Sequence, residues 1–214
     1  MTSKDCGHDD DDKKDTGRRI VGGIVTFIVL VLLVIFIIWL VLRPTKPRFI
    51  LQDATIYAFN LTTPNLLTAT FQVTISSRNP NNRIGVYYER LDVYASYHNQ
   101  QITLPTRLPF AYQGHKDITI WSPFLYGNSV PIAPYLGSSL QLDQNAGLVF
   151  MNIKVNGRVK WKVGTWVSGK YHLNANCPAY ITFGNRGKIN GFNVASATAV
   201  KLQLSSGCQV DVAI

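Results

Sequence analysis

An uncharged apolar run of 23 residues, Ile20 to Leu42, is the feature that most constrains how this chain folds. At about 1.5 Å per residue, a helix of that length crosses a hydrocarbon core of roughly 30 Å with a slight tilt. A cleaved signal peptide is the alternative, but its apolar region is usually about 7–15 residues long and ends at small residues. Here the run continues through Trp39 into Arg43 and Pro44. The sequence therefore predicts a single transmembrane helix over residues 20–42, acting as a signal-anchor.

The segments on either side of this run are polar. Residues 1–19 contain no aromatic residue and carry four consecutive aspartates, which predicts a disordered cytosolic tail. Residues 43–48 contain two prolines and are predicted to form a stiff, extended stalk. The remaining residues, 49–214, are enough for one domain.

The orientation of the span depends on features beyond it, because four Lys and Arg closely precede the run and three follow it. Asn60 begins an Asn-Leu-Thr triplet, the acceptor pattern for N-glycosylation. Cys177 and Cys208 lie on the same side of the span, with Cys6 alone on the other side, which suits one disulfide in an oxidising compartment. Two unpaired buried thiols are the alternative. Together these features predict a type II protein whose carboxyl-terminal domain lies outside the cytosol.

Charge is concentrated in the part that follows the span. Residues 43–214 carry sixteen Lys and Arg against six Asp and Glu, a formal charge of +10. A basic domain attracts anions, which are nucleic acid inside a cell and acidic lipid head groups or acidic polysaccharide outside it. The span, the expected outward face and the lack of a known docking motif argue against nucleic acid.

Apolar and polar residues alternate at least seven times after residue 48, which is the period of a half-buried β-strand. The apolar positions are Ala54, Ile56 and Ala58; Phe71, Val73 and Ile75; Leu91, Val93, Ala95 and Tyr97; Ile118 and Ile120; Val149, Met151, Ile153 and Val155; Val159, Trp161 and Val163; and Val200, Leu202 and Leu204. Between two of these runs, Asn156-Gly157 predicts a type I′ hairpin. Helical periodicity is limited to one short turn near residues 130–142. The pattern predicts a mainly β protein, an antiparallel sandwich of about seven short strands.

A tight turn is predicted where the strand that contains Ile75 ends. Asn79 and Asn81 can bond their own backbone and Pro80 fixes its φ angle, so the chain reverses here before the next strand begins near Val86. Arg83 follows the turn, and with Arg78 it could clamp an anion or pair with Glu89. The segment is therefore predicted to be first a corner of the fold.

Three groups of motifs, in a fixed order, also identify a resemblance. They are Asn79-Pro80-Asn81 followed by Ile84-Gly85-Val86-Tyr87-Tyr88; Pro109-Phe110 with Tyr112-Gln113-Gly114-His115-Lys116; and Val159-Lys160-Trp161-Lys162-Val163-Gly164 with Ser168-Gly169-Lys170-Tyr171 and Cys177. Over roughly residues 45–210, together with the short tail and single span, the chain resembles the plant harpin-induced-like family, whose outer part is a group 2 late-embryogenesis-abundant domain.

The resemblance implies an immunoglobulin- or fibronectin-like β-sandwich on a single-pass plasma-membrane protein, with most of the chain facing the cell wall. It also implies an association with pathogen response, the hypersensitive response, abiotic stress and, in some relatives, plasmodesmata.

Catalytic chemistry is poorly supplied in residues 43–214. They contain six carboxylates and three histidines, and lack a Gly-x-Ser-x-Gly elbow, a Gly-rich phosphate loop and a His-Glu-x-x-His zinc motif. His115, beside Lys116 and Asp117, is the most suggestive group, but a surface histidine without catalytic partners is the simpler interpretation. We therefore predict no catalytic site, no cofactor and no metal.

Binding is better provided for. Lys154, Arg158, Lys160 and Lys162 are predicted to lie on one face of the hairpin at residues 156–157, with no compensating acid. An ordinary solvated sheet face, on which lysine blocks edge-to-edge aggregation, is an equally weighted alternative. Five tyrosines gather near the Asn-Pro-Asn turn, and at least half of them are expected in the core: Tyr87, Tyr88, Tyr94, Tyr97 and Tyr112.

The sequence thus predicts a membrane-anchored, non-enzymatic defence or stress protein that acts by adhesion or partner recognition at the cell surface. The four cations and the corner from Asn79 to Arg83 are expected to meet acidic cell-wall polysaccharide, anionic lipids or a membrane receptor protein. A structural protein that protects against desiccation, or a module that holds a lipid between its sheets, is the alternative. A homo-oligomer is left open.

Overall fold

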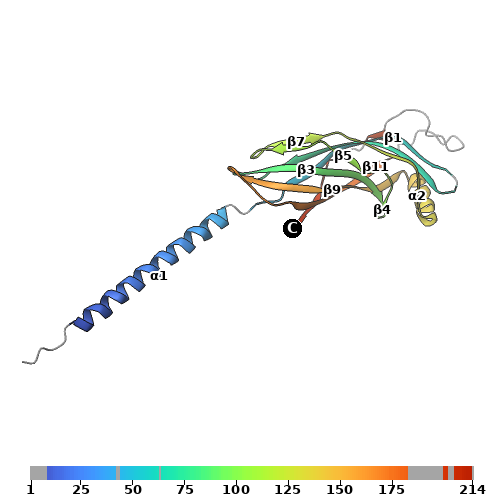
Figure 1. Cartoon of the computed structure of the whole chain (residues 1–214). Coiled ribbons are helices and arrows are strands. Elements are labelled where there is room, and N and C mark those ends of the chain that lie inside the picture. Colours follow the sequence, from blue (N-terminus) through green and yellow to red (C-terminus); the bar gives the residue numbers. More distant parts are fainter. Residues whose placement is uncertain (1–8, 42–43, 63, 183–199, 202–204, 214) are drawn as a thin grey trace, which may run out of the picture. The chain divides into compact units, whose positions relative to one another are not determined.

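The computed structural model describes residues 9–41, 44–62, 64–182, 200–201 and 205–213. The chain divides into two compact units, residues 1–43 and residues 44–214. The first unit contains the long helix α1, and the second contains the β-sheets and the short helix α2 (Figure 1).

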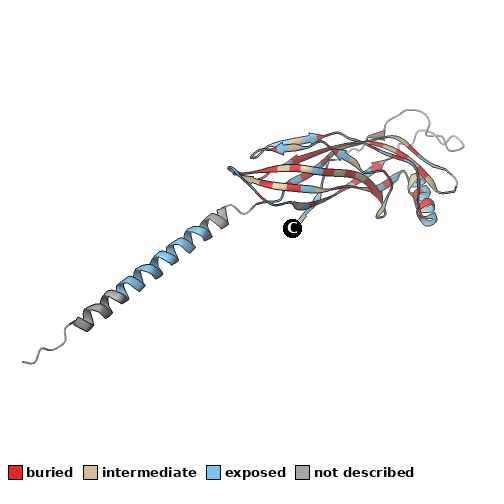
Figure 2. Ribbon diagram, in the orientation of Figure 1, coloured by how far each residue is buried: buried red, intermediate tan, exposed pale blue. Residues whose placement is uncertain are grey.

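Helix α1 runs from Asp9 to Val41. Residues 18–37 within it are apolar enough, over a sufficient length, to cross a membrane, and their side chains are exposed (Figure 2). The helix also includes residues 9–19, for which the sequence predicts disorder. Extending a formed helix costs far less than nucleating one, and aspartates are favourable at its amino-terminal end.

The first sheet is built on β1 and β2, which pair from end to end. Its strands are β1 (Arg48–Thr62), β2 (Leu66–Arg78), β7 (Ile118–Trp121), β8 (Phe124–Pro131), β12 (Val200–Lys201) and β13 (Ser206–Gly207). β12 and β13 pair with β1, while β7 and β8 pair with the other side of β2.

The second sheet is built on β9, which lies between β3 and β11. Its strands are β3 (Ile84–Tyr97), β4 (Gln100–Gln101), β5 (Thr106–Leu108), β6 (Ala111–Gln113), β9 (Leu148–Val163), β10 (Trp166–Val167), β11 (Tyr171–Thr182) and β14 (Gln209–Ala213). β4, β5 and β6 pair with β3, β14 pairs with β11, and β10 folds back on the end of β9.

The two sheets enclose one apolar core, seen as the buried segments along the strands in Figure 2. Aromatic contacts cross from sheet to sheet: the ring of Tyr88 in β3 lies edge-on to Phe49 of β1, with centroids 6.1 Å apart, and to Trp121 of β7, at 5.4 Å. All strand pairs among the described residues are antiparallel. The prediction of a mainly β, antiparallel sandwich is confirmed.

The predicted hairpin at Asn156-Gly157 is wrong, because β9 passes straight through both residues. Gly157 pairs with Leu173 of β11 on one side and Leu91 of β3 on the other. A Cβ atom at Gly157 would lie 2.0 Å from the carbonyl oxygen of Arg90, so glycine here permits close approach of the neighbouring backbone. β9 is one of five strands of 12 to 16 residues in this domain, whereas the sequence predicts about seven short strands.

The faces of two predicted strands also differ from expectation. β1 has register shifts between Leu51 and Asp53 and again between Ile56 and Ala58. Each shift inserts a residue, so the inward face continues at Phe59 rather than Ala58. In β7, Ile118 and Ile120 point outward and are exposed, because Trp121 occupies the core side.

Two connecting segments differ as well. Helix α2 (Pro134–Ala146) has 13 residues where one short turn is predicted, and it buries Leu136 and Leu140 at four-residue spacing. The predicted stalk at residues 43–48 is largely part of the domain, since Pro47 is buried and Arg48 begins β1. Of the last predicted strand, Leu202 and Leu204 lie outside the described residues, as does Cys6.

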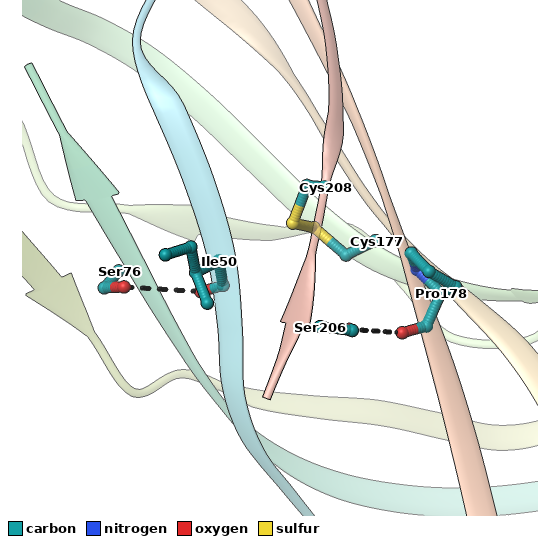
Figure 3. The surroundings of a disulfide bond; sticks show 6 residues. All are labelled: Ile50, Ser76, Cys177, Pro178, Ser206 and Cys208. Atoms are coloured by element: carbon teal, nitrogen blue, oxygen red, sulfur yellow. Dashed lines mark hydrogen bonds between the residues drawn. A yellow bond between two sulfur atoms is a disulfide. The ribbon is translucent and has the colours of Figure 1, made fainter. Parts of the chain in front are cut away.

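A disulfide joins Cys177 and Cys208 (Figure 3). Cys177 is fully buried in β11, and Cys208 lies between β13, which pairs with β1, and β14, which pairs with β11. The bridge therefore fixes the point where the end of the chain passes from the first sheet to the second. In the same region Ser206 donates a hydrogen bond to the carbonyl oxygen of Pro178.

Candidate functional site

Four cationic side chains project from one face of β9, and we call them the cationic face: Lys154, Arg158, Lys160 and Lys162. They occupy alternate positions opposite buried Val155, Val159 and Trp161, so the period of the strand sends them all to the outer surface of the second sheet. The face runs along a single strand, not across a hairpin as predicted. From its first to its last member it extends about 26 Å, at roughly 3.3 Å per residue.

An acidic residue compensates part of this face, contrary to the sequence prediction. Glu89 is the additional residue of a register shift between Tyr88 and Arg90 in β3, and its carboxylate forms an ion pair with Lys160. The ammonium of Lys170 lies 3.9 Å from the other carboxylate oxygen. The hydrogen bond from Lys160, and then the nearby positive charges, hold the pKa of Glu89 below its usual value. Lys160 is therefore not available as an uncompensated charge.

Lys162 contacts aromatic rings. Its ammonium nitrogen lies 5.7 Å from the ring centroid of Tyr87 and 5.2 Å from that of Tyr112. The Tyr112 ring lies against the backbone of Gly85, where an added Cβ would meet its hydroxyl oxygen at 2.6 Å. Phe110 stacks on Tyr87 with ring centroids 6.0 Å apart. Cation–π attraction positions Lys162 and leaves its charge in place.

Lys154 and Arg158 form no ion pair with any residue that the structure describes. Arg158 lies opposite Arg90 across the sheet, but Arg90 is paired with Asp92 at 2.9 Å. Arg107 approaches the other oxygen of Asp92 at 3.5 Å. The charges of Lys154, Arg158 and Lys162 thus remain to attract an anion.

The cationic face adjoins a polar hollow of about 340 Å³ that the sequence analysis missed. Tyr94 of β3, Lys154 of β9 and Asn176 of β11 line one side of it, in register across the sheet. Asn156 and Asn174 line the adjacent row. Asparagine is depleted in strands, so Asn174 and Asn176 at alternate positions could have indicated a polar site in the sequence. Only the register of the strands shows that they lie beside Tyr94 and Lys154.

The Asn-Pro-Asn corner is a buried clamp. The Asn79 side-chain amide donates to the carbonyl oxygens of Ile84 at 2.7 Å and Gly114 at 2.8 Å. Its side-chain oxygen accepts from the backbone N–H of Asn81 at 3.0 Å. Asn81 in turn exchanges two hydrogen bonds with the backbone of Thr45, at 2.9 and 2.8 Å. The clamp joins the β2–β3 turn to the start of the domain and to the loop before β7.

This burial changes the predicted role of the corner. Asn79 and Asn81 are fully or nearly fully buried, so their side chains cannot present the surface that the sequence predicts. Pro80 is half-buried and Arg83 is exposed. Glu89, an alternative partner for Arg78 and Arg83, is paired with lysines instead.

The tyrosines divide between core and surface. Tyr88 is buried, its hydroxyl lies 2.7 Å from that of Ser77 and donates to Gln113, and burial raises its pKa far above the usual value. Tyr97 is also buried, and burial together with its bond to Asp143 raises its pKa strongly. These two hydroxyls are neutral structural donors. Of the others, Tyr87 and Tyr94 are half-buried and Tyr112 is exposed.

The histidines of the domain are on the surface. His98, His115 and His172 are all exposed. Lys116 has a φ angle of 58°, and its backbone N–H donates a hydrogen bond to the carbonyl oxygen of Asn81. The loop that contains His115 is therefore held against the Asn-Pro-Asn corner. Within the described ranges, no three His, Cys, Asp or Glu side chains are grouped to hold a metal ion.

Fold and surface together define an antiparallel β-sandwich protein with an amino-terminal apolar helix and a basic outer face. A family model described as late embryogenesis abundant protein (LEA_2) matches residues 74–177. NDR1/HIN1-like protein 1 of Arabidopsis thaliana is 56% identical over 211 residues, which cover 98% of this chain and 100% of that protein. NDR1/HIN1-like protein 12 of the same plant is 56% identical over 213 residues, with 99% and 100% covered.

NDR1/HIN1-like protein 26 of Arabidopsis thaliana is 44% identical over 161 residues, covering 74% of this chain and 76% of that protein. The chain belongs to the NDR1/HIN1-like family of plant late-embryogenesis-abundant proteins, as the three groups of motifs between Asn79 and Cys177 predict. This family is related to plant defence and stress and is not known for enzymes. The apolar helix α1 is compatible with a membrane anchor.

Proposed function

We propose that this protein is a non-enzymatic, membrane-anchored defence or stress protein whose sandwich recognises an anionic partner outside the cytosol. Helix α1 would anchor it in the plasma membrane as a type II protein. The disulfide between Cys177 and Cys208 supports an oxidising compartment, and the exposed position of Asn60 is compatible with N-glycosylation.

The single observation that carries this proposal is the cationic face of β9. Three of its four members form no ion pair with a described acidic residue, and all four point to the same outer surface. An ordinary solvated sheet face mixes both signs of charge. Here Glu89 pairs with Lys160, and Asp92 pairs with the flanking arginines. The other cations of β9 therefore produce a positive potential along this strand.

Direct binding tests the proposal. The full-length protein would be placed in nanodiscs of neutral lipid, and its affinity for polygalacturonate would be measured at several salt concentrations. We expect saturable binding that weakens with salt, because surface charges are screened over about 8 Å at physiological ionic strength. Replacement of Lys154, Arg158, Lys160 and Lys162 by Ser should lower the affinity by about tenfold or more, since it removes three cations that have no ion-pair partner and separates Glu89 from Lys160.

A matched control removes four exposed cations that lie outside the cationic face: Arg48, Arg78, Arg83 and Lys116. This variant loses the same four positive charges. If binding depended only on net charge, the two variants would therefore lose the same affinity. Equal losses in both variants, or no binding by the parent even at low salt, would refute recognition by β9.

Protection of membranes or proteins during water loss is a second candidate, favoured by the description of the matching family model. It predicts that the parent and the four-serine variant preserve a labile enzyme equally well through drying and rehydration. A lipid seated between the sheets is not proposed, because the residues that face the interior, such as Leu51, Val73 and Tyr88, already fill that space and are almost wholly buried.

A further inference from the structure

The polar hollow beside the cationic face has the chemistry of a saccharide site. Two rows of side chains cross it in register. The first row is Tyr94, Lys154, Asn176 and Gln209, and the second is Asn156, Asn174 and Asp211. Neighbouring strands lie about 4.8 Å apart, so four strands spread the first row over roughly 14 Å. That length exceeds a single pyranose ring, and the hollow of about 340 Å³ falls within the range of ligand sites.

The side chains in these rows contribute little to the fold. Asn174, Asn176 and Gln209 are exposed, and their side chains form no hydrogen bond that the structure records among the residues it describes. Asparagine disfavours strands, where a β-branched residue would be more stable at an exposed position. Residues that are unfavourable for their secondary structure and make no stabilising contact are characteristic of functional sites.

The hollow is also partly organised in advance. The Asn156 amide donates to the Tyr94 hydroxyl at 3.0 Å, which fixes both groups. The Lys46 ammonium lies 3.3 Å from Asp211 and donates to the carbonyl oxygen of Val210 at 2.8 Å, so the negative charge of Asp211 is compensated. Lys154 has no such partner among the described residues, and it supplies the one uncompensated charge of the hollow.

This donor set matches hydroxyl groups better than phosphate. A carboxamide offers both donors and an acceptor, and a sugar hydroxyl likewise donates and accepts. A phosphate ester of a lipid head group only accepts hydrogen bonds, so it would use the amide N–H donors of the two rows but not their oxygens. The lone ammonium of Lys154 adds a preference for a carboxylate on the sugar.

We propose that these two rows form a binding site for an acidic saccharide, a chain of uronic acid residues. Amides of Asn174, Asn176 and Gln209 bond its ring hydroxyls, and Lys154 pairs with a carboxylate. The other cations of β9 attract the rest of the polyanion. The site rests on the proposed function, for which it specifies the partner, but it acts through hydroxyl recognition as well as charge.

The experiment uses the full-length protein in detergent and two polymers, an oligomer of galacturonic acid and a polyacrylate of matched charge and length. The double variant Asn174→Val with Asn176→Val leaves every charge in place. Because each hydrogen bond to a neutral group contributes about 1 kcal/mol, losing two or more should weaken saccharide binding by about tenfold or more. Polyacrylate binding should stay the same.

Asn152→Val is the matched control. It alters the same residue type on the same outer face of the second sheet, in β9 rather than β11 and outside the residues that line the hollow, and it should change neither affinity. Thermal unfolding should show that all three variant positions tolerate valine. Undiminished saccharide binding by the double variant, with polyacrylate binding still sensitive to the four-serine change, would overturn the saccharide site and spare the proposed function. If the parent binds neither polymer at low salt, both proposals fail.

Discussion

The Asn-Pro-Asn corner should determine stability, and Asn79→Ala is the substitution that tests it. The side chain of Asn79 makes four hydrogen bonds inside the domain: two to the carbonyl oxygens of Ile84 and Gly114, and two to the backbone and side-chain amides of Asn81. Alanine removes all four and leaves buried polar groups without partners. A buried group left unpaired costs about 1–3 kcal/mol, although entering water can recover part of that.

We therefore expect Asn79→Ala to lower the free energy of unfolding by about 3–5 kcal/mol. With a urea dependence of roughly 2 kcal/mol per molar, the midpoint of unfolding should fall by about 1.5–2.5 M. The assay is urea unfolding of the full-length protein in detergent, followed by tryptophan fluorescence with the disulfide intact. Asn82→Ala is the matched control: Asn82 is exposed in the same turn, and its replacement should change stability by no more than about 0.5 kcal/mol.

Asn79→Asp separates the hydrogen bonds from side-chain volume. The introduced carboxylate cannot donate to the two carbonyl oxygens, and its burial beside them raises its pKa above the unfolded value. The destabilisation should thus be large at neutral pH and should diminish as the pH falls and the carboxyl group becomes protonated. A loss below about 1 kcal/mol for Asn79→Ala, or equal losses at Asn79 and Asn82, would refute the clamp.

Three further substitutions test other parts of the structure. Gly157→Ala should destabilise the domain by about 3 kcal/mol or more, or prevent folding, because its Cβ would overlap the β3 backbone, and an unchanged thermal midpoint would contradict the close approach. Glu89→Gln should free Lys160 and strengthen polyanion binding a few-fold at neutral pH. The pKa of Glu89 is lowered from 4.5 in the folded state, so its ion pair stabilises the fold above that pH. This stabilisation is lost as the pH falls through the pKa of the folded state, and parent and variant should therefore become equally stable at low pH. Replacing Cys177 and Cys208 together by Ala should lower the free energy of unfolding by about 3–4 kcal/mol, because the unfolded chain is no longer closed into a loop by cysteines 31 residues apart. Urea unfolding measures this loss, and a reductant should not change the stability of the variant.

Local features of the sequence were sufficient for the broad plan. The run from Ile20 to Leu42 predicts an apolar helix because length and lack of charge alone decide whether a helix can span a bilayer. Period-two alternation predicts strands that bury one face, and it correctly places Val155, Val159 and Trp161 inside. The same alternation predicts that Lys154, Arg158, Lys160 and Lys162 share the outer face, since all four have the same parity.

The sequence failed where a local preference competes with pairing across the sheet. Asn156-Gly157 favours a hairpin in isolation, yet β3 and β11 pair with both sides of an uninterrupted β9, and the hydrogen bonds of two ladders outweigh one turn preference. Register shifts in β1 move Phe59 to the inside, and a register shift in β3 brings Glu89 to Lys160. A shift of one residue reverses a face without changing composition, so local pattern does not reveal it.

What the sequence by itself determined was each residue's local tendency: which segment is apolar, which strands alternate, which side chains carry charge. What only the tertiary structure decided was which distant residues become neighbours. Asn79 meets Gly114 and Asn81 meets Thr45 in the corner, while Lys154, Asn174 and Asn176 meet around one hollow. These contacts depend on how the strands and the loops between them are aligned, and that alignment is set by the packing of the whole core rather than by any segment alone.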